Sequence, residues 1–275
     1  MVKKFDNVKC IFIDIDNTLT NNNKEVTNYT KKVLSKLNIY KIICTGRDNL
    51  YAIQKSKDAS CSSIVISDNG ALIYDYNKDI TIYENPITNN ILNKIWDYSL
   101  NNNIDCVYNT KKSRYKHFIF KDNNYIKHDT LINSLEEIIE SVTQIVASNK
   151  NYDTMIDFIN YISNIKELKI NNTNINKKIS PNKSYYCDIN ITEVSKGNAA
   201  KELIKYLNIN NDDTMAIGDS ENDISLFENV NFSIVMKNAT EEMKKKGSII
   251  TEFTNDEDGL AKFIEKYIIG EDVKW

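Results

Sequence analysis

The feature that most constrains this fold is a repeated pattern in which a short apolar, β-branched run stops abruptly at polar residues. Val8–Ile13 ends at Asp14, and Ile39–Cys44 ends at Thr45 and Gly46. The segments that separate such runs have the apolar spacing of helices. Buried strands that alternate with helices in this way predict a parallel, doubly wound sheet.

The pattern occupies two stretches of the chain and predicts an α/β fold with a Rossmann-like parallel core. In the first stretch we expect strands at 8–13, 39–44 and 64–67, and helices at 27–37 and about 48–57. After Ser195 we expect strands at 214–217, 232–236 and 248–251, and helices at 196–207, from 220, at 239–246 and at 257–268. Both stretches therefore contribute strands to one sheet.

Between about Tyr83 and Ile191 the pattern changes, because the strands there end without acidic or glycine clusters. We expect helices at 88–102, 129–140 and 151–164, strands at 105–110, 115–121 and 142–148, and two final strands. This stretch is predicted to be an inserted α+β cap domain, 84–191. The catalytic core would then consist of 1–83 and 192–275.

Composition narrows the classes of partner. The chain has 275 residues and a net charge of -3, with 35 Lys+Arg against 38 Asp+Glu, so it gives no reason to expect nucleic acid or an anionic membrane. Its five cysteines form no CxxC pair, and no apolar stretch is long enough to span a bilayer. We expect a cytoplasmic protein, and the sequence does not predict its oligomeric state.

Polar residues of chemical interest follow the strands of the predicted core sheet. Open parallel sheets bind ligands beyond the carboxyl ends of their strands. These residues are Asp14, Asp16, Thr45, Gly46, Asp219, Asn222 and Asp223. Because they come from separate strand ends, we expect them to converge on one pocket.

The predicted pocket is rich in oxygen ligands. A single aspartate after a strand is more often a helix cap, but Asp14, Asp16 and Asp219 together suit Mg²⁺ better than zinc. Thr45 and Gly46 offer a hydroxyl and backbone N–H groups that can hold a phosphate. Lys196, at a helix start, would supply a cation, although a lysine there is usually only a solvated charge.

Several reaction classes are excluded by what the sequence lacks. The only histidines, His117 and His128, fall in the expected cap, so the core has no Ser-His-Asp or Cys-His site. There is no GxxxxGK[ST] loop and no GxGxxG, so nucleoside triphosphate and dinucleotide sites lack support. A carboxylate nucleophile acting in phosphoryl transfer is the remaining option.

Four ordered segments carry a resemblance to a known family. Asp14-Ile15-Asp16-Asn17-Thr18-Leu19-Thr20, Thr45-Gly46-Arg47, Lys196-Gly197 and Gly218-Asp219-Ser220-Glu221-Asn222-Asp223 are similar to the motifs of the haloacid dehalogenase superfamily. The insertion between the second and third motifs resembles the Cof-like branch with its large α/β cap, as does Ser67-Asp68-Asn69-Gly70-Ala71. The resemblance covers nearly the whole chain.

The resemblance implies a role for each matching residue. Asp14 would be the nucleophile and a metal ligand, and Asp16 the general acid and base, with its backbone carbonyl on Mg²⁺. The phosphate would be bound by Thr45, Gly46, Asn222 and Lys196. Asp219 would complete the metal ligands, and Asp223 would brace them.

The resemblance implies a Mg²⁺-dependent phosphatase that hydrolyses a small phosphorylated metabolite, a sugar phosphate above all, through an aspartyl-phosphate. Two alternatives stay open. One is a phosphomutase of the same superfamily, and the other is a non-catalytic phosphate-binding regulator. We expect the loops of the cap to set substrate preference. Two departures from the usual pattern are Asn17 and Lys237, each in place of a glycine.

Overall fold

The computed structural model describes residues 5–117, 129–176 and 183–270 and divides into two compact units. The core unit lies within Met1–Arg47, Tyr51–Tyr83 and Ser195–Trp275, and the cap unit within Asp48–Leu50 and Glu84–Val194. We expected 48–50 and 192–194 in the core. Hydrogen bonds explain the difference, since Thr192 N–H donates to the Glu167 carbonyl (2.9 Å) and the Asn49 amide to the Lys111 carbonyl (2.7 Å).

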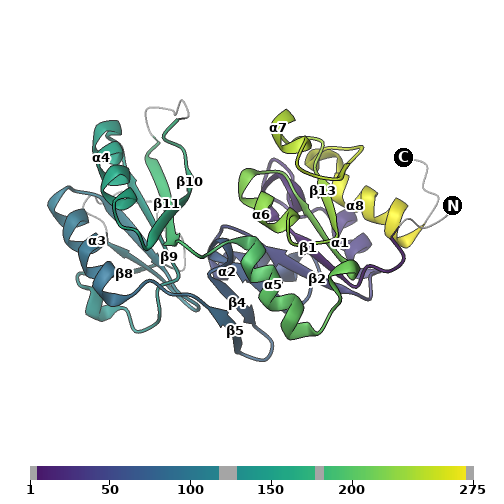
Figure 1. The fold of residues 1–275 in the computed structure, drawn as a ribbon, viewed down its shortest axis with the longest axis horizontal. Coiled ribbons are helices and arrows are strands. Elements are labelled where there is room, and N and C mark those ends of the chain that lie inside the picture. The colour runs from purple at the N-terminus through teal and green to yellow at the C-terminus, as the bar shows by residue number, and fades with distance from the viewer. Residues whose placement is uncertain (1–4, 118–128, 177–182, 271–275) are drawn as a thin grey trace. The chain divides into compact units, whose positions relative to one another are not determined.

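The core unit is built on an eight-stranded sheet in the order β14-β13-β12-β1-β2-β3-β4-β5 (Figure 1). Six strands are parallel: β14 (Ile249–Ile250), β13 (Phe232–Val235), β12 (Thr214–Gly218), β1 (Cys10–Ile13), β2 (Tyr40–Cys44) and β3 (Ile64–Ser67). The expected parallel core is confirmed. We did not anticipate β4 (Leu72–Asp75), which is antiparallel to β3, or β5 (Ile80–Glu84).

Helices pack on both faces of this sheet because its strands are apolar on both sides. Ile11 and Ile13 of β1 belong to one buried cluster, with Leu34 of α1 (Asn28–Ser35) and Leu260 of α8 (Gly259–Ile264). Phe12 belongs to the opposite cluster, with buried residues of α5 (Lys196–Leu207), α6 (Ile224–Phe227) and α7 (Glu241–Lys244). The remaining helix is α2 (Asn49–Asp58), which belongs to the core unit from Tyr51 on. The result is the doubly wound arrangement expected from alternating strands and helices.

The strand order brings the functional segments together. β1 lies between β12 and β2, with Ile13 opposite Ile217 and Ile43. The carboxyl ends of these three parallel strands therefore reach the same edge of the sheet, followed by Asp14, Thr45 and the segment after Gly218. In Figure 1, purple-blue and green-yellow parts of the chain lie side by side in this unit.

The cap unit has its own six-stranded sheet in the order β10-β11-β9-β6-β7-β8. Its strands are β6 (Asp105–Asn109), β7 (Arg114–His117), β8 (Asp129–Leu131), β9 (Gln144–Asn149), β10 (Leu168–Thr173) and β11 (Tyr185–Ile191). Neighbouring strands of this sheet are antiparallel, except that β7 and β8 are parallel. Two helices, α3 (Asn89–Asn101) and α4 (Tyr152–Ser163), bury apolar side chains and meet where Tyr98 stacks on Tyr161.

One predicted element of the cap is wrong. The helix expected at 129–140 is replaced by β8 and a single 3₁₀ turn, Leu135–Glu137. Asp129 pairs with Arg114 and Lys116 across the β7–β8 ladder, and these long-range ion pairs override the local helical spacing. Residues 118–121 of the strand expected at 115–121, and His128, lie outside the described residues.

The cysteines and the lengths of the helices bear on two expectations from the sequence. All five cysteines are unpaired, and four of them are buried. Among the helices that the structure describes, none is long and apolar enough to cross a membrane.

Close packing between α5 and α6 fixes the start of α5, and Gly197 makes it possible. A Cβ added at this position would overlap the Ser225 carbonyl oxygen, and the Gly197 N–H donates to Ser225 Oγ at 3.2 Å. We expect Gly197→Ala to destabilise the protein by about 1–3 kcal/mol, because overpacking outweighs the helical preference for alanine. Urea unfolding measures this change. The exposed Lys201→Ala in the same helix is the control and should change stability by less than about 0.5 kcal/mol.

Candidate active site

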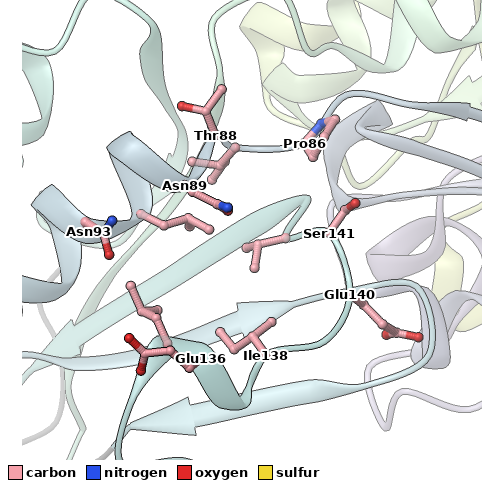
Figure 2. Close-up of a pocket in the computed structure, with 12 residues that line it drawn as sticks. Pro86, Thr88, Asn89, Asn93, Glu136, Ile138, Glu140 and Ser141 are labelled. Carbon is pink, nitrogen blue, oxygen red and sulfur yellow. The ribbon is translucent and has the colours of Figure 1, made fainter.

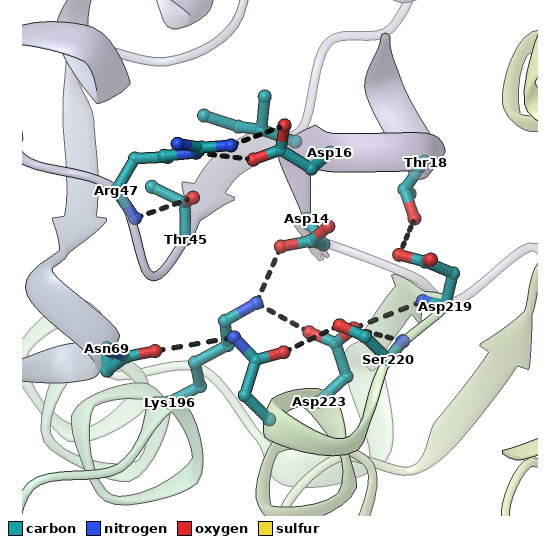
Figure 3. Close-up of polar contacts among 12 residues, drawn as sticks. Asp14, Asp16, Thr18, Thr45, Arg47, Asn69, Lys196, Asp219, Ser220 and Asp223 are labelled. Carbon is teal, nitrogen blue, oxygen red and sulfur yellow. Dashed lines mark hydrogen bonds and ion pairs between the residues drawn. The ribbon is translucent and has the colours of Figure 1, made fainter. Parts of the chain in front are cut away.

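A buried lysine between two aspartates forms the centre of the site (Figure 3). Lys196, the first residue of α5, is only 1% exposed, and its Nζ donates to Asp14 Oδ1 and to Asp223 Oδ1, each at 2.6 Å. Burial raises the pKa of Asp14, the charges of Asp223 and Asp219 add to this effect, and Lys196 opposes it. Asp14 follows β1 directly, so its backbone is fixed by the central strand of the core.

Asp219 adds a third carboxylate beside this pair. Oxygen atoms of Asp14, Asp219 and Asp223 lie within 4.8 Å of one another. Thr18 Oγ1 donates to Asp219 Oδ1 at 3.3 Å, but Asp219 is only partly buried. Burial and the neighbouring charge of Asp223 raise the pKa of Asp219 to about 6. A cluster of oxygen ligands whose charges repel one another is a site that a hard divalent cation would stabilise.

Asp223 is held as a brace by the turn after β12. Its Oδ2 accepts from the N–H groups of Asp219 and Ser220, both at 3.1 Å, while its Oδ1 accepts from Lys196. A Cβ at Gly218 would overlap the Asp223 carboxylate, so only glycine leaves room for it there. Because both Asp223 oxygens have donors, this side chain orients Asp219 and Lys196.

The turn after β1 uses asparagine where the related pattern has glycine. Asn17 has φ 58° in the irregular turn Ile15–Leu19, a left-handed conformation that asparagine tolerates. The second departure, Lys237, does not have a positive φ, and its N–H donates to Thr251 Oγ1 at 2.9 Å. Neither substitution therefore distorts the backbone around Asp14.

Thr45 and Gly46 lie against two asparagines. The Asn222 amide donates to Asn69 Oδ1 at 3.3 Å, and a Cβ at Gly46 would overlap that same oxygen. Asn69 itself has φ 60°, and its N–H donates to the Thr45 carbonyl at 3.1 Å. Our selection of site residues from the sequence missed Asn69, although it belongs to the segment Ser67–Ala71 that resembles the Cof-like branch.

The side chain of Asp16, the second residue predicted to be catalytic, is turned away from Asp14 (Figure 3). Arg47 binds it with two nitrogen atoms, at 2.8 and 3.1 Å, and Lys24 Nζ lies 3.1 Å from Oδ1. Burial alone would raise the pKa of Asp16, but hydrogen bonds and charge from Arg47 and Lys24 lower it. We did not predict the roles of these two cations. Arg47 follows the Thr-Gly pair directly, which is the only signal the sequence offers.

The cap unit contains a separate pocket of about 520 Å³, between the segment before α3 and residues 135–142 (Figure 2). Pro86, Asn89 and Glu140 are among its lining residues. None of the residues predicted to act in catalysis or phosphate binding lines it. The predicted site residues belong instead to the carboxyl edge of the core sheet and to the start of α5.

Comparison with known proteins shows the family to which the chain belongs. The model of the haloacid dehalogenase-like hydrolase family matches residues 11–264. A 5-amino-6-(5-phospho-D-ribitylamino)uracil phosphatase of Bacillus subtilis is 25% identical, over 95% of this chain and 96% of that protein.

Solved structures share the fold. A haloacid dehalogenase-like hydrolase of Bacteroides thetaiotaomicron has a TM-score of 0.81 at 21% identity, over 94% of this chain and 99% of the other. A sugar phosphatase of subclass IIB of that superfamily has a TM-score of 0.74 at 20% identity, over the same shares of the two chains. The chain belongs to the haloacid dehalogenase-like hydrolases and is a phosphatase of their Cof-like branch.

Proposed function

We propose that this phosphatase hydrolyses small phosphomonoesters, sugar phosphates above all, in the cytosol, through an aspartyl-phosphate (an acyl phosphate) formed on Asp14 and with Mg²⁺ as cofactor. The observation that carries the proposal is the buried Lys196, which binds Asp14 and Asp223 at 2.6 Å beside the carboxylate of Asp219. This arrangement keeps a carboxylate fixed and desolvated at the end of the central strand, as a nucleophile in phosphoryl transfer requires.

In the first step, an Asp14 oxygen attacks phosphorus while the bond from phosphorus to the leaving oxygen breaks. Asp16 takes up a proton when it leaves Arg47 and Lys24 and gives this proton to the leaving oxygen, so the organic part leaves as an alcohol. Lys196 offsets charge on the phosphoryl oxygens, and the Thr45 hydroxyl and the Gly46 and Asn222 N–H groups orient them. Charge on the transferring group is thus balanced by donors fixed before the substrate arrives.

In the second step, water attacks phosphorus and breaks its bond to Asp14. Asp16, now ionised, takes a proton from this water, which restores both aspartates and releases inorganic phosphate. For both steps the Asp16 carboxylate must leave Arg47 and Lys24 and turn toward the leaving oxygen. In this proposal, the position of Asp16 beside Arg47 and Lys24 is the one it takes between turnovers.

The donors present fit Mg²⁺, the metal that phosphatases of this superfamily generally use. Asp14, Asp219 and the Asp16 main-chain carbonyl would hold it, with Asp223 as brace. All of these are oxygen ligands, and burial together with the charge of Asp223 raises the pKa of Asp219, an effect that a cation would oppose. When bound, Mg²⁺ supplies positive charge for the phosphoryl oxygens.

Sugar phosphates are proposed from the names of similar proteins. The matched B. subtilis protein is named for a phosphatase acting on a phosphoribityl compound, and one structural neighbour is a sugar phosphatase. A screen of phosphorylated metabolites with detection of released phosphate tests this part of the proposal. Release from no sugar phosphate, with release from other phosphomonoesters, would contradict the substrate class alone.

Replacement of the nucleophile tests the covalent step. Asp14→Asn should leave less than about 1% of wild-type kcat with p-nitrophenyl phosphate, because deletion of a nucleophile causes very large losses. The exposed Asp6→Asn is the matched control and should keep wild-type activity. Phosphate release by Asp14→Asn well above that level would contradict the phospho-aspartate, and inactivity of wild type would favour a phosphate-binding regulator.

Removal of the metal tests the cofactor. Activity should vanish in EDTA and return with added Mg²⁺, and Zn²⁺ should not be the best activator, because the ligands are all oxygens. The measurement is phosphate release after chelation and after stepwise addition of each ion. Full activity in rigorously chelated enzyme would count against a metal at Asp14 and Asp219.

A further inference from the structure

We propose that Arg47 and Lys24 form an anion-binding subsite, which takes a second negatively charged group of the substrate when Asp16 turns toward the leaving oxygen. That group is a carboxylate or a second phosphate on the organic part. The inference rests on the proposed function and narrows the class of phosphomonoester that the same site prefers. It starts from the position of Asp16, which lies beside Arg47 and apart from Asp14 and Lys196 (Figure 3).

Both oxygens of the Asp16 carboxylate are occupied. Arg47 Nε donates to Oδ2 at 2.8 Å, a second guanidinium nitrogen donates to Oδ1 at 3.1 Å, and Lys24 Nζ lies 3.1 Å from Oδ1. Asp16 has to exchange these contacts for the leaving oxygen in each turnover. The exchange removes the carboxylate that both cations now bind, and an anion of the substrate can take its place.

The two cations are held in place by α2. The Tyr51 ring lies 5.8 Å from the Arg47 guanidinium and 5.4 Å from Lys55 Nζ, within the range of cation–π attraction. Lys55 Nζ donates to the Lys24 carbonyl at 2.8 Å. Lys24 has φ 64°, which is uncommon for a residue other than glycine, and its N–H donates to the Asn21 carbonyl at 2.9 Å. One helix face therefore positions both positive groups.

The cations are also accessible to a ligand. The side chains of Arg47 and Lys24 are 56% and 46% exposed, while that of Asp16 is 25% exposed. An incoming anion would accept the same hydrogen bonds from both cations, which offsets the contacts that Asp16 gives up. A guanidinium binds carboxylates and phosphates with two parallel hydrogen bonds, as Arg47 now binds Asp16. The subsite thus fits an oxyanion.

A matched pair of substrates tests the subsite. 3-Phosphoglycerate and glycerol 3-phosphate differ only in a carboxylate against a hydroxymethyl group, and glycerol 1,3-bisphosphate supplies the second-phosphate arm. We expect wild type to prefer at least one anionic substrate over glycerol 3-phosphate by about tenfold or more in kcat/KM. The substrate that is preferred shows whether the subsite binds a carboxylate or a second phosphate.

Variants of the two cations should remove that preference. The relevant ratio is kcat/KM for the preferred anionic substrate divided by kcat/KM for glycerol 3-phosphate. It should fall several-fold in Arg47→Ala and in Lys24→Ala, and it should approach one in the double variant. Arg47→Lys should restore part of the ratio, because it keeps the charge without the two parallel hydrogen bonds. Lys32→Ala, an exposed lysine on α1, is the matched control and should keep the wild-type ratio.

Binding gives a readout that is independent of turnover. Calorimetric titration of Asp14→Asn should show the same preference for the anionic ligand. The double variant Asp14→Asn/Asp16→Asn should bind 3-phosphoglycerate or the bisphosphate several-fold more tightly than Asp14→Asn alone, since the competing carboxylate is gone. A purely structural role for the Arg47–Asp16 pair predicts no such gain.

Two results would overturn the subsite. One is equal kcat/KM values and equal affinities of wild type for all three ligands, and the other is a preference for the anionic ligands that survives in the double variant. Either can occur in an enzyme that hydrolyses p-nitrophenyl phosphate with Mg²⁺, in which case the proposed function stands. If no substrate is hydrolysed, the calorimetric comparison still decides for or against the anion subsite.

Discussion

The structure of the site depends on one buried cation, Lys196, and the two carboxylates that compensate it. Burial alone would lower the pKa of this lysine, but Asp14 and Asp223 raise it above its ordinary value. A buried charge is stable only when it is paired and hydrogen-bonded. The ends of β1 and β12 and the start of α5 are therefore held at one point by an interaction that none of them could make alone.

Local backbone chemistry makes this convergence possible in a chain with only seven glycines. Nine residues other than glycine have a positive φ in the described ranges, and seven of them are four asparagines and three aspartates. Asn17 and Asn69 are two of these, one beside Asp14 and one against Gly46. Asparagine tolerates the left-handed region because its short polar side chain can hydrogen-bond locally. The asparagine-rich composition thus supplies turns that glycine would form in other sequences.

The sequence predicted those features of the fold and the candidate site that depend on local pattern. Strands that end at Asp14, Thr45 and Gly218 indicated one sheet edge, and α5 begins at Lys196 as expected. Features that depend on distant partners were not predictable. The 129–140 segment has helical spacing, but its first residues form β8, and Asp129 pairs with Lys116 of β7. The ion pair of Arg47 with Asp16 joins side chains that are 31 residues apart in the sequence. A single sequence does not show which distant side chains Asp129 and Asp16 pair with.

The separation of Asp16 from Asp14 has an electrostatic reason. Four carboxylates, those of Asp14, Asp16, Asp219 and Asp223, follow the strands of one sheet edge, and together they would repel one another in a poorly solvated space. The fold divides them into two groups with separate cations. Lys196 compensates Asp14 and Asp223, while Arg47 and Lys24 compensate Asp16. Asp14, the proposed nucleophile, is thereby kept near a fixed, buried charge, and Asp16, the proposed acid–base group, near exposed charges that an arriving anion can reach. The proposed function needs a rigid centre for attack on phosphorus and an adjustable region that binds the organic part. The separation of Lys196 from Arg47 and Lys24 supplies both.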